Sequence, residues 1–423
     1  MDAHRVAITG LGLVSPFGRD LDDFFQHLLN SESAVRLLRL DDPPRPLAIP
    51  FVVCDAFDAG RDLGKALSGT LDRFAQLGLA AAFAAWDDAG FERRSDNESR
   101  DGWGVAWGSA LGGTLAYEKG YREMWIHGRE RISPLSVVLG MNNAANAQIS
   151  IQLGLGGISM SYTVACASST IAIGEAFRRV RSGEAAVMVT GGSDVPQAYG
   201  VARAWDALRV LAAGDETSAA TACRPFSADR DGLVLGEGGA ALVLEEWEHA
   251  RARGARIHGE LIGYATTCDH SHLVRPHAAG QIRALRATLA DASLVADELD
   301  YINAHGTATL EGDPVEVEAI RAVWNGSRHG PAVSATKSLH GHLLGAAGAI
   351  EAIVTVLALR EGAIPPTAHL QRVDPACTGI DHVVEARCGQ ALRTALSSSF
   401  AFGGSNAVLA FRAPPQSLST EET

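Results

Sequence analysis

The sequence predicts a layered α/β fold made of two similar halves. Two observations support this: short apolar runs, typical of buried strands, recur along the chain, and longer helical runs alternate with them. No low-complexity linker interrupts the alternation. We expect a first half over residues 1–255, a second half over residues 256–412 and a polar tail over residues 413–423.

The elements of the first half follow from its apolar runs. The run 71–86 is strongly helical and largely apolar, so we expect a buried helix there. The other expected elements are a buried strand over 6–14, a helix over 21–29, short strands over 103–109 and 186–192, and a closing segment near 243–254.

The second half is expected to repeat this alternation. A strand over 257–264 opens it, and a helix rich in small residues covers 343–361. The remaining expected elements are short strands over 301–304 and 332–335 and a final strand pair, 382–386 with 407–411.

The composition is that of a compact globule with a large core. Apolar residues make up 47% of the chain and charged residues 20%. The net charge of −13 argues against nucleic acid as a partner, because nucleic-acid binding depends on basic patches. No apolar run reaches the roughly 18 residues of a membrane span, and the N-terminus lacks signal-peptide features.

The cysteine and histidine spacings argue against metal or disulfide chemistry. None of the six cysteines forms a Cys-x-x-Cys pair, so neither a zinc site nor a disulfide framework is expected. The 14 histidines show no His-Glu-x-x-His spacing. We therefore expect no metal, and we expect a reducing, cytoplasmic location.

Cys166 is the first candidate for chemistry. It follows a strand-like run and precedes an amphipathic stretch, 171–181, so it should stand at the start of a helix. The helix dipole and the unpaired amides of the first turn favour a thiolate, which is the nucleophilic form of cysteine. The arrangement resembles a nucleophile elbow. The alternative is a small buried cysteine that fills space.

Two histidine motifs strengthen the case for Cys166. His305 follows an apolar run and precedes Gly306, so it should lie in a loop at the end of a strand. Lys337 and His342 occur where a second strand-like run turns into a helix of small residues. A cysteine elbow, two histidines at strand ends and a lysine together indicate a site for nucleophilic catalysis.

These motifs stand in an order that makes the pattern specific. The chain resembles the β-ketoacyl-(acyl-carrier-protein) synthases of the thiolase superfamily, most closely the synthase II type. The resemblance implies a five-layer αβαβα thiolase-like fold and a homodimer with strands paired across its two-fold axis. The segments that carry it are 6–15, the elbow 161–170, the segment 230–238, the two histidine motifs at 301–313 and 334–351, and 399–406.

The resemblance assigns the chemistry residue by residue. Cys166 matches the nucleophile that accepts an acyl chain from acyl carrier protein. His305 and His342 match the pair that helps the malonyl group to lose carbon dioxide, by donating N–H groups to the enolate oxygen. The amides of Cys166 and Phe402 match an oxyanion hole. No cofactor is implied, since the substrates are carried on the phosphopantetheine of the carrier protein.

Four further residues receive supporting roles from the resemblance. Lys337 matches a family lysine whose buried ammonium needs a partner, and Glu351 matches that partner. Thr307 and Thr309 match hydroxyl groups that bind the phosphopantetheine arm. Phe402 also matches a gate between the malonyl side and the acyl pocket, in a loop that its glycines allow to move.

The acyl pocket by the same resemblance is lined by Leu111, Trp205 and Phe402. Ser136 stands where the synthase II type commonly has a bulky aromatic residue that reaches the partner's pocket. Serine there would open the far end of the pocket, whereas Trp205 would narrow one wall. Two substrates stay open: the saturated chains of ordinary fatty acid biosynthesis, and a polyene or polyketide chain.

Carrier docking and two departures from the family pattern complete the interpretation. Arg131 and Arg209, with Lys65 as a weaker candidate, match basic positions that would attract an acidic carrier protein. His340 stands where the family usually has a small hydroxyl residue, and we expect it at the surface or behind the catalytic residues. Leu310 replaces a common proline.

The resemblance therefore predicts an acyltransferase that extends an acyl chain by two carbons through decarboxylative condensation with malonyl-carrier protein. The alternative pathway is a type II polyketide or aryl polyene pathway. A degradative thiolase is disfavoured because His342 replaces its second cysteine. A non-catalytic chain-length factor is disfavoured because Cys166 is present, although the chain could form a heterodimer with such a factor.

Overall fold

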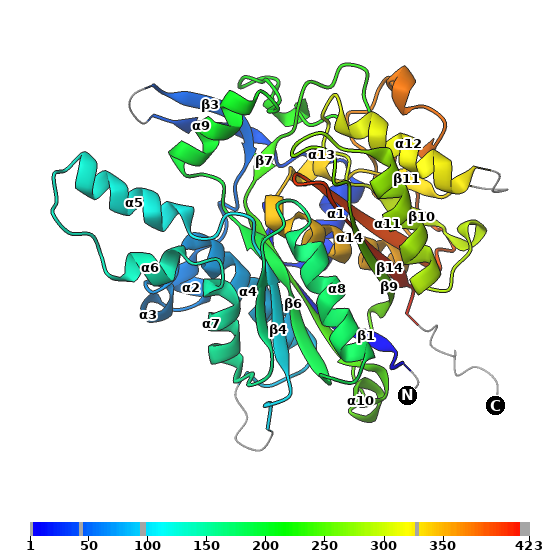
Figure 1. Cartoon of the computed structure of the whole chain (residues 1–423), viewed down its shortest axis with the longest axis horizontal. Coiled ribbons are helices and arrows are strands. Elements are labelled where there is room, and N and C mark those ends of the chain that lie inside the picture. Colours follow the sequence, from blue (N-terminus) through cyan, green and yellow to red (C-terminus); the bar gives the residue numbers. More distant parts are fainter. Residues whose placement is uncertain (1–2, 42–44, 94–98, 326–329, 415–423) are drawn as a thin grey trace.

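The computed structural model describes residues 3–41, 45–93, 99–325 and 330–414 (Figure 1). The strands of the main sheet form one ladder in the order β12-β11-β10-β13-β14-β9-β1-β8-β6-β4-β5. Their bounds are β1 Val6–Val14, β4 Gly104–Gly108, β5 Ser159–Tyr162, β6 Val187–Asp194, β8 Gly238–Glu246, β9 Gly259–Cys268, β10 Tyr301–Asn303, β11 Ala332–Ser334, β12 Asp381–His382, β13 Thr394–Ala401 and β14 Ser405–Arg412.

The ladder consists of two halves with the same pairing pattern. In the first half β5, β4 and β6 are parallel, and β8 and β1 continue the sheet antiparallel. In the second half β11, β10 and β13 are parallel, and β14 and β9 continue it antiparallel. The halves meet where the first residues of β1 pair with the first residues of β9. This repeat confirms the two similar halves.

Two helices form the central layer between the sheet halves. Helix α8 (Ser168–Arg181) follows β5, and helix α14 (Ala347–Glu361) follows β11 in the other half. They contact each other, and each contacts strands of both halves. Every residue of α14 from Ala347 to Leu359 is buried, as expected for a helix that is apolar on all sides.

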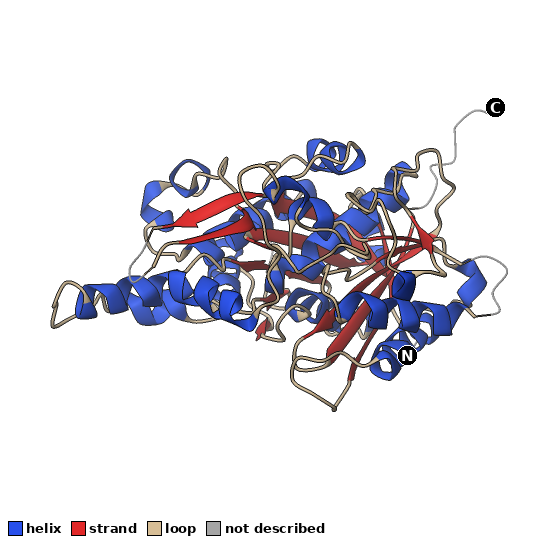
Figure 2. Ribbon diagram, turned by 90° about the horizontal axis from the view of Figure 1, so that it is seen from above, coloured by secondary structure: helices blue, strands red, loops and turns tan. Residues whose placement is uncertain are grey.

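Alternate strand residues face the central and outer layers. In β6, Met188 joins the core around α8 and α14, whereas Val187 and Val189 join the core beneath α4 (Arg73–Asp88) and α7 (Ala144–Leu153). In β14, Leu409 faces the central layer and Val408 the outer helices α11 (Ala278–Asp291) and α12 (Gly312–Trp324). The result is the expected five-layer αβαβα thiolase-like arrangement, with helices on both sides of the strands (Figure 2).

The remaining elements surround this core. A small sheet, β2 (Arg36–Leu40), β3 (Leu47–Val52) and β7 (Leu235–Gly236), lies beside α9 (Tyr199–Leu208), and α5 (Thr114–Trp125) and α6 (Leu135–Gly140) project from the body (Figure 1). Among the described helices, none combines the length and hydropathy needed to span a bilayer. The other helices are α1 Leu21–Leu29, α2 Ala59–Asp62, α3 Lys65–Ser68, α10 Trp247–Ala252 and α13 Lys337–His340.

Several predicted elements agree closely with the structure and a few do not. The strand 6–14 and the helix 21–29 are confirmed as β1 and α1. The expected helix over 343–361 begins only at Ala347, because residues 344–346 form a tighter 3-10 turn. The expected strand pair 382–386 with 407–411 is wrong: β12 pairs with β11, and β14 pairs with β13 and β9. The polar tail lies outside the described residues from residue 415 onward.

Candidate active site

Cys166 stands in a tight turn between β5 and α8. The strand ends at Tyr162, and the chain reverses through Ala165, whose φ of +44° is unusual for a residue with a side chain. The Ser168 hydroxyl holds the turn: it accepts the Val164 N–H at 2.9 Å and donates to the Ala165 carbonyl at 2.7 Å. This strand–turn–helix geometry is that of the predicted elbow, with the strand ending four residues before the cysteine.

His342 contacts the cysteine directly. Its Nε2 lies 3.0 Å from the Cys166 sulfur, and its Nδ1 accepts the Leu344 N–H at 3.1 Å. Burial and the Lys337 ammonium lower the pKa of His342 well below its usual range, so the ring is neutral. A neutral ring that accepts at Nδ1 carries its proton on Nε2. His342 therefore presents an N–H donor to the reacting sulfur.

The Cys166 thiol is not pre-ionised, contrary to the sequence-based expectation. Burial raises the pKa of Cys166 to about 11, although the Lys337 ammonium and the backbone amides of Phe402 and Cys166 favour the thiolate. The penalty for placing a charge in an apolar site outweighs the pull of the amides and the ammonium. The resting side chain is therefore a thiol whose sulfur is already within reach of two amides and a positive charge.

Lys337 joins the second histidine to this cluster. Its ammonium donates to the His305 carbonyl at 2.6 Å and forms a very short contact with Glu351, the predicted partner. It also lies 3.4 Å from His305 Nδ1. Because an ammonium only donates, His305 Nδ1 must accept and Nε2 must carry the proton. Burial and Lys337 lower the pKa of His305 as well, which makes it a second neutral donor.

A carboxylate that the sequence did not reveal fixes His305. Glu316, buried in α12, accepts the His305 N–H and the Gly306 N–H, both at 2.7 Å. Gly306 adopts a φ of +36°, and a Cβ there would lie 2.3 Å from the Ala335 Cβ. The His305 and His342 rings are thereby held perpendicular, with centroids 5.5 Å apart. Nothing in the local sequence distinguishes Glu316 from a solvated helix residue.

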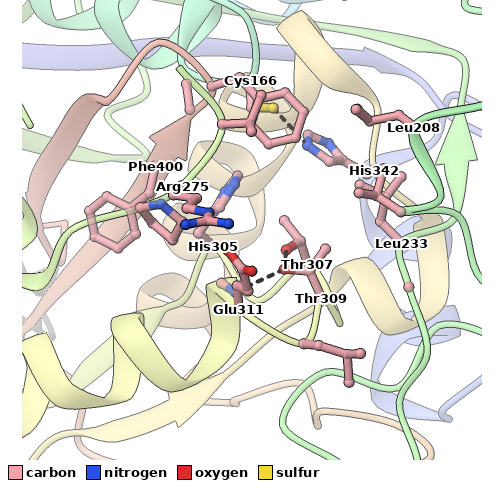
Figure 3. A pocket seen from close by; sticks show the side chains of 18 of the residues that line it. Cys166, Leu208, Leu233, Arg275, His305, Thr307, Thr309, Glu311, His342 and Phe400 are labelled. Carbon is pink, nitrogen blue, oxygen red and sulfur yellow. Dashed lines mark hydrogen bonds between the residues drawn. The ribbon is translucent and has the colours of Figure 1, made fainter. Parts of the chain in front are cut away.

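Cys166, His305, His342 and Glu316 form the floor of a cavity of about 420 Å³ (Figure 3). Thr307 and Thr309, whose hydroxyl oxygens lie 3.1 Å apart, line its wall as predicted. Arg209 and Arg275 also line it, and Arg275 was not predicted. The same cavity is also lined by Cys166, so the two threonines and the two arginines share one cavity with the cysteine.

Phe402 lines the cavity and is held in place by its neighbours. Its ring stacks on Trp205, with centroids 5.9 Å apart and planes 18° from parallel. Gly403 and Gly404 follow it with φ of +90° and +75°, a conformation that favours glycine. The Gly403 N–H donates to the Leu273 carbonyl at 2.7 Å. The predicted gate residue and the predicted pocket residue therefore lie in contact.

Arg230, part of a motif that the sequence singled out, supports the wall of the cavity. It is buried and donates to the carbonyls of Thr309 and Leu310 at 3.0 and 3.1 Å. It also donates to the Ser227 carbonyl at 2.8 Å and contacts the carboxylates of Asp374, at 2.6 Å, and Asp313, at 3.5 Å. The arginine holds the loop that carries the two threonine hydroxyls.

Several predicted residues do not line the cavity. Leu111 packs in the apolar cluster that also holds Trp205 and Leu344, and Ser136 is buried in α6. Lys65 begins α3, and Arg131 lies exposed between α5 and α6. His340 is fully buried, so of its two expected positions the one at the surface is wrong and the one behind the catalytic residues agrees with the structure. Both of its ring nitrogens have partners within the protein.

The cluster also has the composition of a potential metal site. Cys166, His305 and His342 each offer a ligand atom, and these atoms lie within 4.8 Å of one another. However, the Lys337 ammonium stands 3.4 Å from His305 Nδ1 and would repel a cation. The charge distribution fits a developing negative charge better than a bound cation.

Comparison with known proteins gives consistent matches over nearly the whole chain. The models of the N-terminal and C-terminal β-ketoacyl synthase domains match residues 3–250 and 258–371. The chain is 41% identical to nodulation protein E of Rhizobium sp. (strain N33), over 97% of this chain and 99% of that protein. It is 37% identical to 3-oxoacyl-(acyl-carrier-protein) synthase 2 of Staphylococcus aureus (strain COL), over 96% and 98%. A type II PKS acyl-carrier protein in complex with its ketosynthase has been solved, and that structure matches with a TM-score of 0.87 and 29% identity, over 98% and 100%.

Proposed function

The chain belongs to the β-ketoacyl synthase family, whose members transfer acyl groups and form carbon–carbon bonds, and we propose that Cys166, His305 and His342 perform this reaction. The observation that carries the proposal is the 3.0 Å contact between the Cys166 sulfur and His342 Nε2 on the cavity floor. His305 supplies a second ring at the same place.

In the first step Cys166 accepts the acyl chain from a carrier thioester. The cysteine sulfur bonds to the acyl carbon, the bond from that carbon to the carrier sulfur breaks, and the thiol proton leaves with the carrier thiol. Negative charge develops on the thioester oxygen, and the amides of Cys166 and Phe402 are the proposed donors to it. Their favourable influence on a Cys166 thiolate supports this assignment.

In the second step the deacylated carrier protein leaves, and a carrier protein that bears a malonyl group binds in its place. The carbon–carboxylate bond of the malonyl group breaks, carbon dioxide leaves, and the electron pair forms an enolate. The Nε2–H groups of His305 and His342 donate to the enolate oxygen, which needs neutral rings that already hold a proton. The carbanion attacks the acyl carbon on Cys166, a carbon–carbon bond forms, and the cysteine sulfur departs.

A carrier protein is the proposed source of both substrates. The related ketosynthase solved with its acyl-carrier protein supports this partner. Thr307 and Thr309 would bind the phosphopantetheine arm, and Arg209 would contact the acidic carrier at the mouth. Arg131 and Lys65 are proposed contacts only if a partner subunit brings them to the mouth. The free state of all six cysteines is consistent with a cytoplasmic location.

We further propose a homodimer formed through α5, α6 and the edge strand β5. Tyr117, Tyr121 and Trp125 form a stacked row along α5, and Trp125 is 75% exposed. Val137, on α6, is 62% exposed, and β5 is an unpaired edge of the sheet. Exposed apolar rows beside an open sheet edge indicate an interface. Light scattering of the Trp125→Glu variant tests this proposal, and the variant should be monomeric. The alternative is that a chain-length factor, and not a second copy of this chain, covers the same surface.

The chain class of the substrate is proposed to be fatty acyl, with a polyketide or polyene chain as the second candidate. Ser136 does not line this chain's own cavity, but the resemblance places it toward the partner's pocket, where a serine would leave more room than an aromatic ring, and this favours the second candidate. Trp205 opposes it by narrowing the wall behind Phe402. Rates of Cys166 acylation by carrier proteins that bear saturated or unsaturated acyl chains decide between the two candidates. A preference for saturated medium chains excludes the polyketide or polyene substrate.

Intact-protein mass spectrometry tests the central assignment. Wild-type protein incubated with acyl-carrier protein should gain the mass of the acyl group, and Cys166→Ala should gain none. Cys223→Ala, another buried cysteine, serves as the control and should load like wild type. An adduct that persists in Cys166→Ala, or no adduct in wild type with any chain, would overturn the assignment.

A further inference from the structure

The fully buried imidazole of His340 lies directly before the catalytic turn. His340 ends α13 and has no exposed surface. The reaction steps derived above do not use it. Burial of a histidine carries a cost unless both nitrogens are satisfied, so its contacts reveal what the ring does.

Both ring nitrogens have partners that fix the direction of their hydrogen bonds. Nδ1 lies 2.9 Å from the Gly341 carbonyl, which can only accept, so Nδ1 carries the proton. Nε2 lies 3.0 Å from the Thr336 hydroxyl and must accept from it. The Thr336 oxygen in turn accepts from the Asn303 side-chain amide at 3.4 Å. Burial and Lys337 lower the pKa of His340 to about 3, which keeps the ring neutral.

This chain of hydrogen bonds runs from one catalytic histidine to the other. Asn303 ends β10, two residues before His305. Gly341 directly precedes His342, and its carbonyl belongs to the same peptide group as the His342 N–H. Thr336 joins the two ends. The network is therefore a second buried polar path between the two turns that carry the proposed donors, beside the direct contact of Lys337 with His305.

The peptide between Gly341 and His342 is held from both sides. The His342 N–H donates to the Val234 carbonyl at 2.7 Å, and His340 Nδ1 donates to the carbonyl of the same peptide. Gly341 has a φ of +69° and no Cβ. Because glycine restricts backbone rotation less than other residues do, this peptide can rotate if one of its two contacts is lost. The orientation of this peptide sets the direction in which the His342 side chain leaves the backbone.

We infer that His340 is a positioning residue that fixes the His342 ring relative to His305 through Thr336 and the Gly341–His342 peptide. The inference rests on the proposed roles of the two histidines. Decarboxylation needs both rings aimed at one oxygen, whereas acyl loading needs only Cys166 and the amides. Small displacements of a catalytic group cost rate steeply. Loss of the His340 contacts should therefore slow decarboxylation much more than acyl loading.

Two amide substitutions separate the two contacts of the His340 ring, because each amide keeps one of them. In His340→Asn the side-chain amide nitrogen takes the place of Nδ1 and keeps the donor to Gly341. In His340→Gln the amide takes the place of Nε2 and loses that donor. We expect kcat of malonyl-carrier decarboxylation within about threefold of wild type for His340→Asn and at least about tenfold lower for His340→Gln, with KM unchanged in both.

Three further measurements make the result decisive. Acyl loading of Cys166, followed by mass, should change by less than about threefold in both variants. Thr336→Val loses the same Nε2 contact that His340→Asn loses, so it should slow decarboxylation by no more than about threefold, and the double variant with His340→Gln should be no slower than His340→Gln alone, because the two residues act in one chain. The melting temperature of each variant reports any purely structural loss.

The outcomes are distinguishable. If His340→Gln folds and decarboxylates at the wild-type rate, or if loading and decarboxylation fall in parallel, His340 has no positioning role. If His342→Ala itself keeps full decarboxylation, the proposed function fails instead. If His342→Ala is inactive and His340→Gln is unchanged, only the positioning inference is lost.

Discussion

The turn that carries Cys166 and the turn that carries Lys337 and His342 occupy equivalent positions in the two halves of the fold. Each follows a parallel strand, β5 or β11, and each leads into a helix of the central layer. The first turn is short and presents one nucleophile, Cys166, to the cavity. The second is longer, with α13 and a 3-10 turn before α14, and it holds an ammonium and two imidazoles.

The difference shows how the repeated fold divides the chemistry. The first turn alone leaves Cys166 as a thiol, because burial outweighs the local amides. The positive charge that opposes this comes from Lys337 in the second turn, and burial together with the same charge lowers the pKa of His305 and His342 and keeps both rings neutral. One half supplies the nucleophile, and the other supplies the electrostatics and the donors.

The largest expected effect comes from removing the charge that joins the two turns. Lys337→Met leaves Glu351 buried without its partner, so we expect a loss of about 3–5 kcal/mol in the free energy of unfolding. The double variant Lys337→Met, Glu351→Leu should regain much of that stability, since it buries no unpaired charge. Urea denaturation measures both. If Lys337→Met is as stable as wild type, the buried pair does not stabilise the second turn.

The next effect separates the roles of the two turns. His342→Ala removes a donor from the second turn, so malonyl decarboxylation should fall by about 10²–10³-fold while Cys166 still accepts an acyl group. His4→Ala, at an exposed histidine paired with Glu246, is the control and should be unchanged. A loss of acyl loading as large as the loss of decarboxylation would contradict the division between the halves.

The titration of Cys166 tests whether burial outweighs the backbone amides and Lys337 in setting the pKa of the nucleophile in the first turn. With a pKa of about 11, the thiolate fraction and hence the rate of alkylation by iodoacetamide should rise about tenfold per pH unit from pH 7 to near 10. It should not level off near the usual pKa of 9.0. Mass spectrometry resolves Cys166 from the exposed Cys268 and Cys388, which serve as references in the same sample. A plateau well below pH 9 would mean that the amides and Lys337 outweigh burial.

The sequence predicted the residues of the site better than their physical state. Cys166, His305 and His342 meet as expected, and Glu351 pairs with Lys337 fourteen positions earlier. The pKa of Cys166 was wrong in direction, because burial is the sum of packing by segments from both halves, which no local pattern reports. The resemblance could not show that His340 is buried, since that position departs from the family pattern.

The missed elements have a similar cause. Strand β13 contains Ser397, Ser398 and Ser399, which read as a polar loop although all three are buried between sheet neighbours. Glu316 lies in the middle of an ordinary helix pattern, and only the tertiary fold brings it to the His305 amide. Local sequence determines which segments are strands and helices, but the burial of polar side chains depends on what packs above them.

The smallest expected effect compares the backbone strain of the two turns. Ala165 in the first turn and Gly341 in the second both have positive φ, +44° and +69°. In Ala165→Gly the relief of strain, about 1–2 kcal/mol, is largely offset by the greater freedom of glycine in the unfolded chain, so stability should change by less than about 1 kcal/mol. Gly341→Ala adds strain of about 1–2 kcal/mol, and its Cβ would lie 2.9 Å from the Val52 side chain. Thermal denaturation should show Gly341→Ala to be the less stable variant. The reverse order would mean that the elbow, and not the longer turn, is where this fold stores its backbone strain.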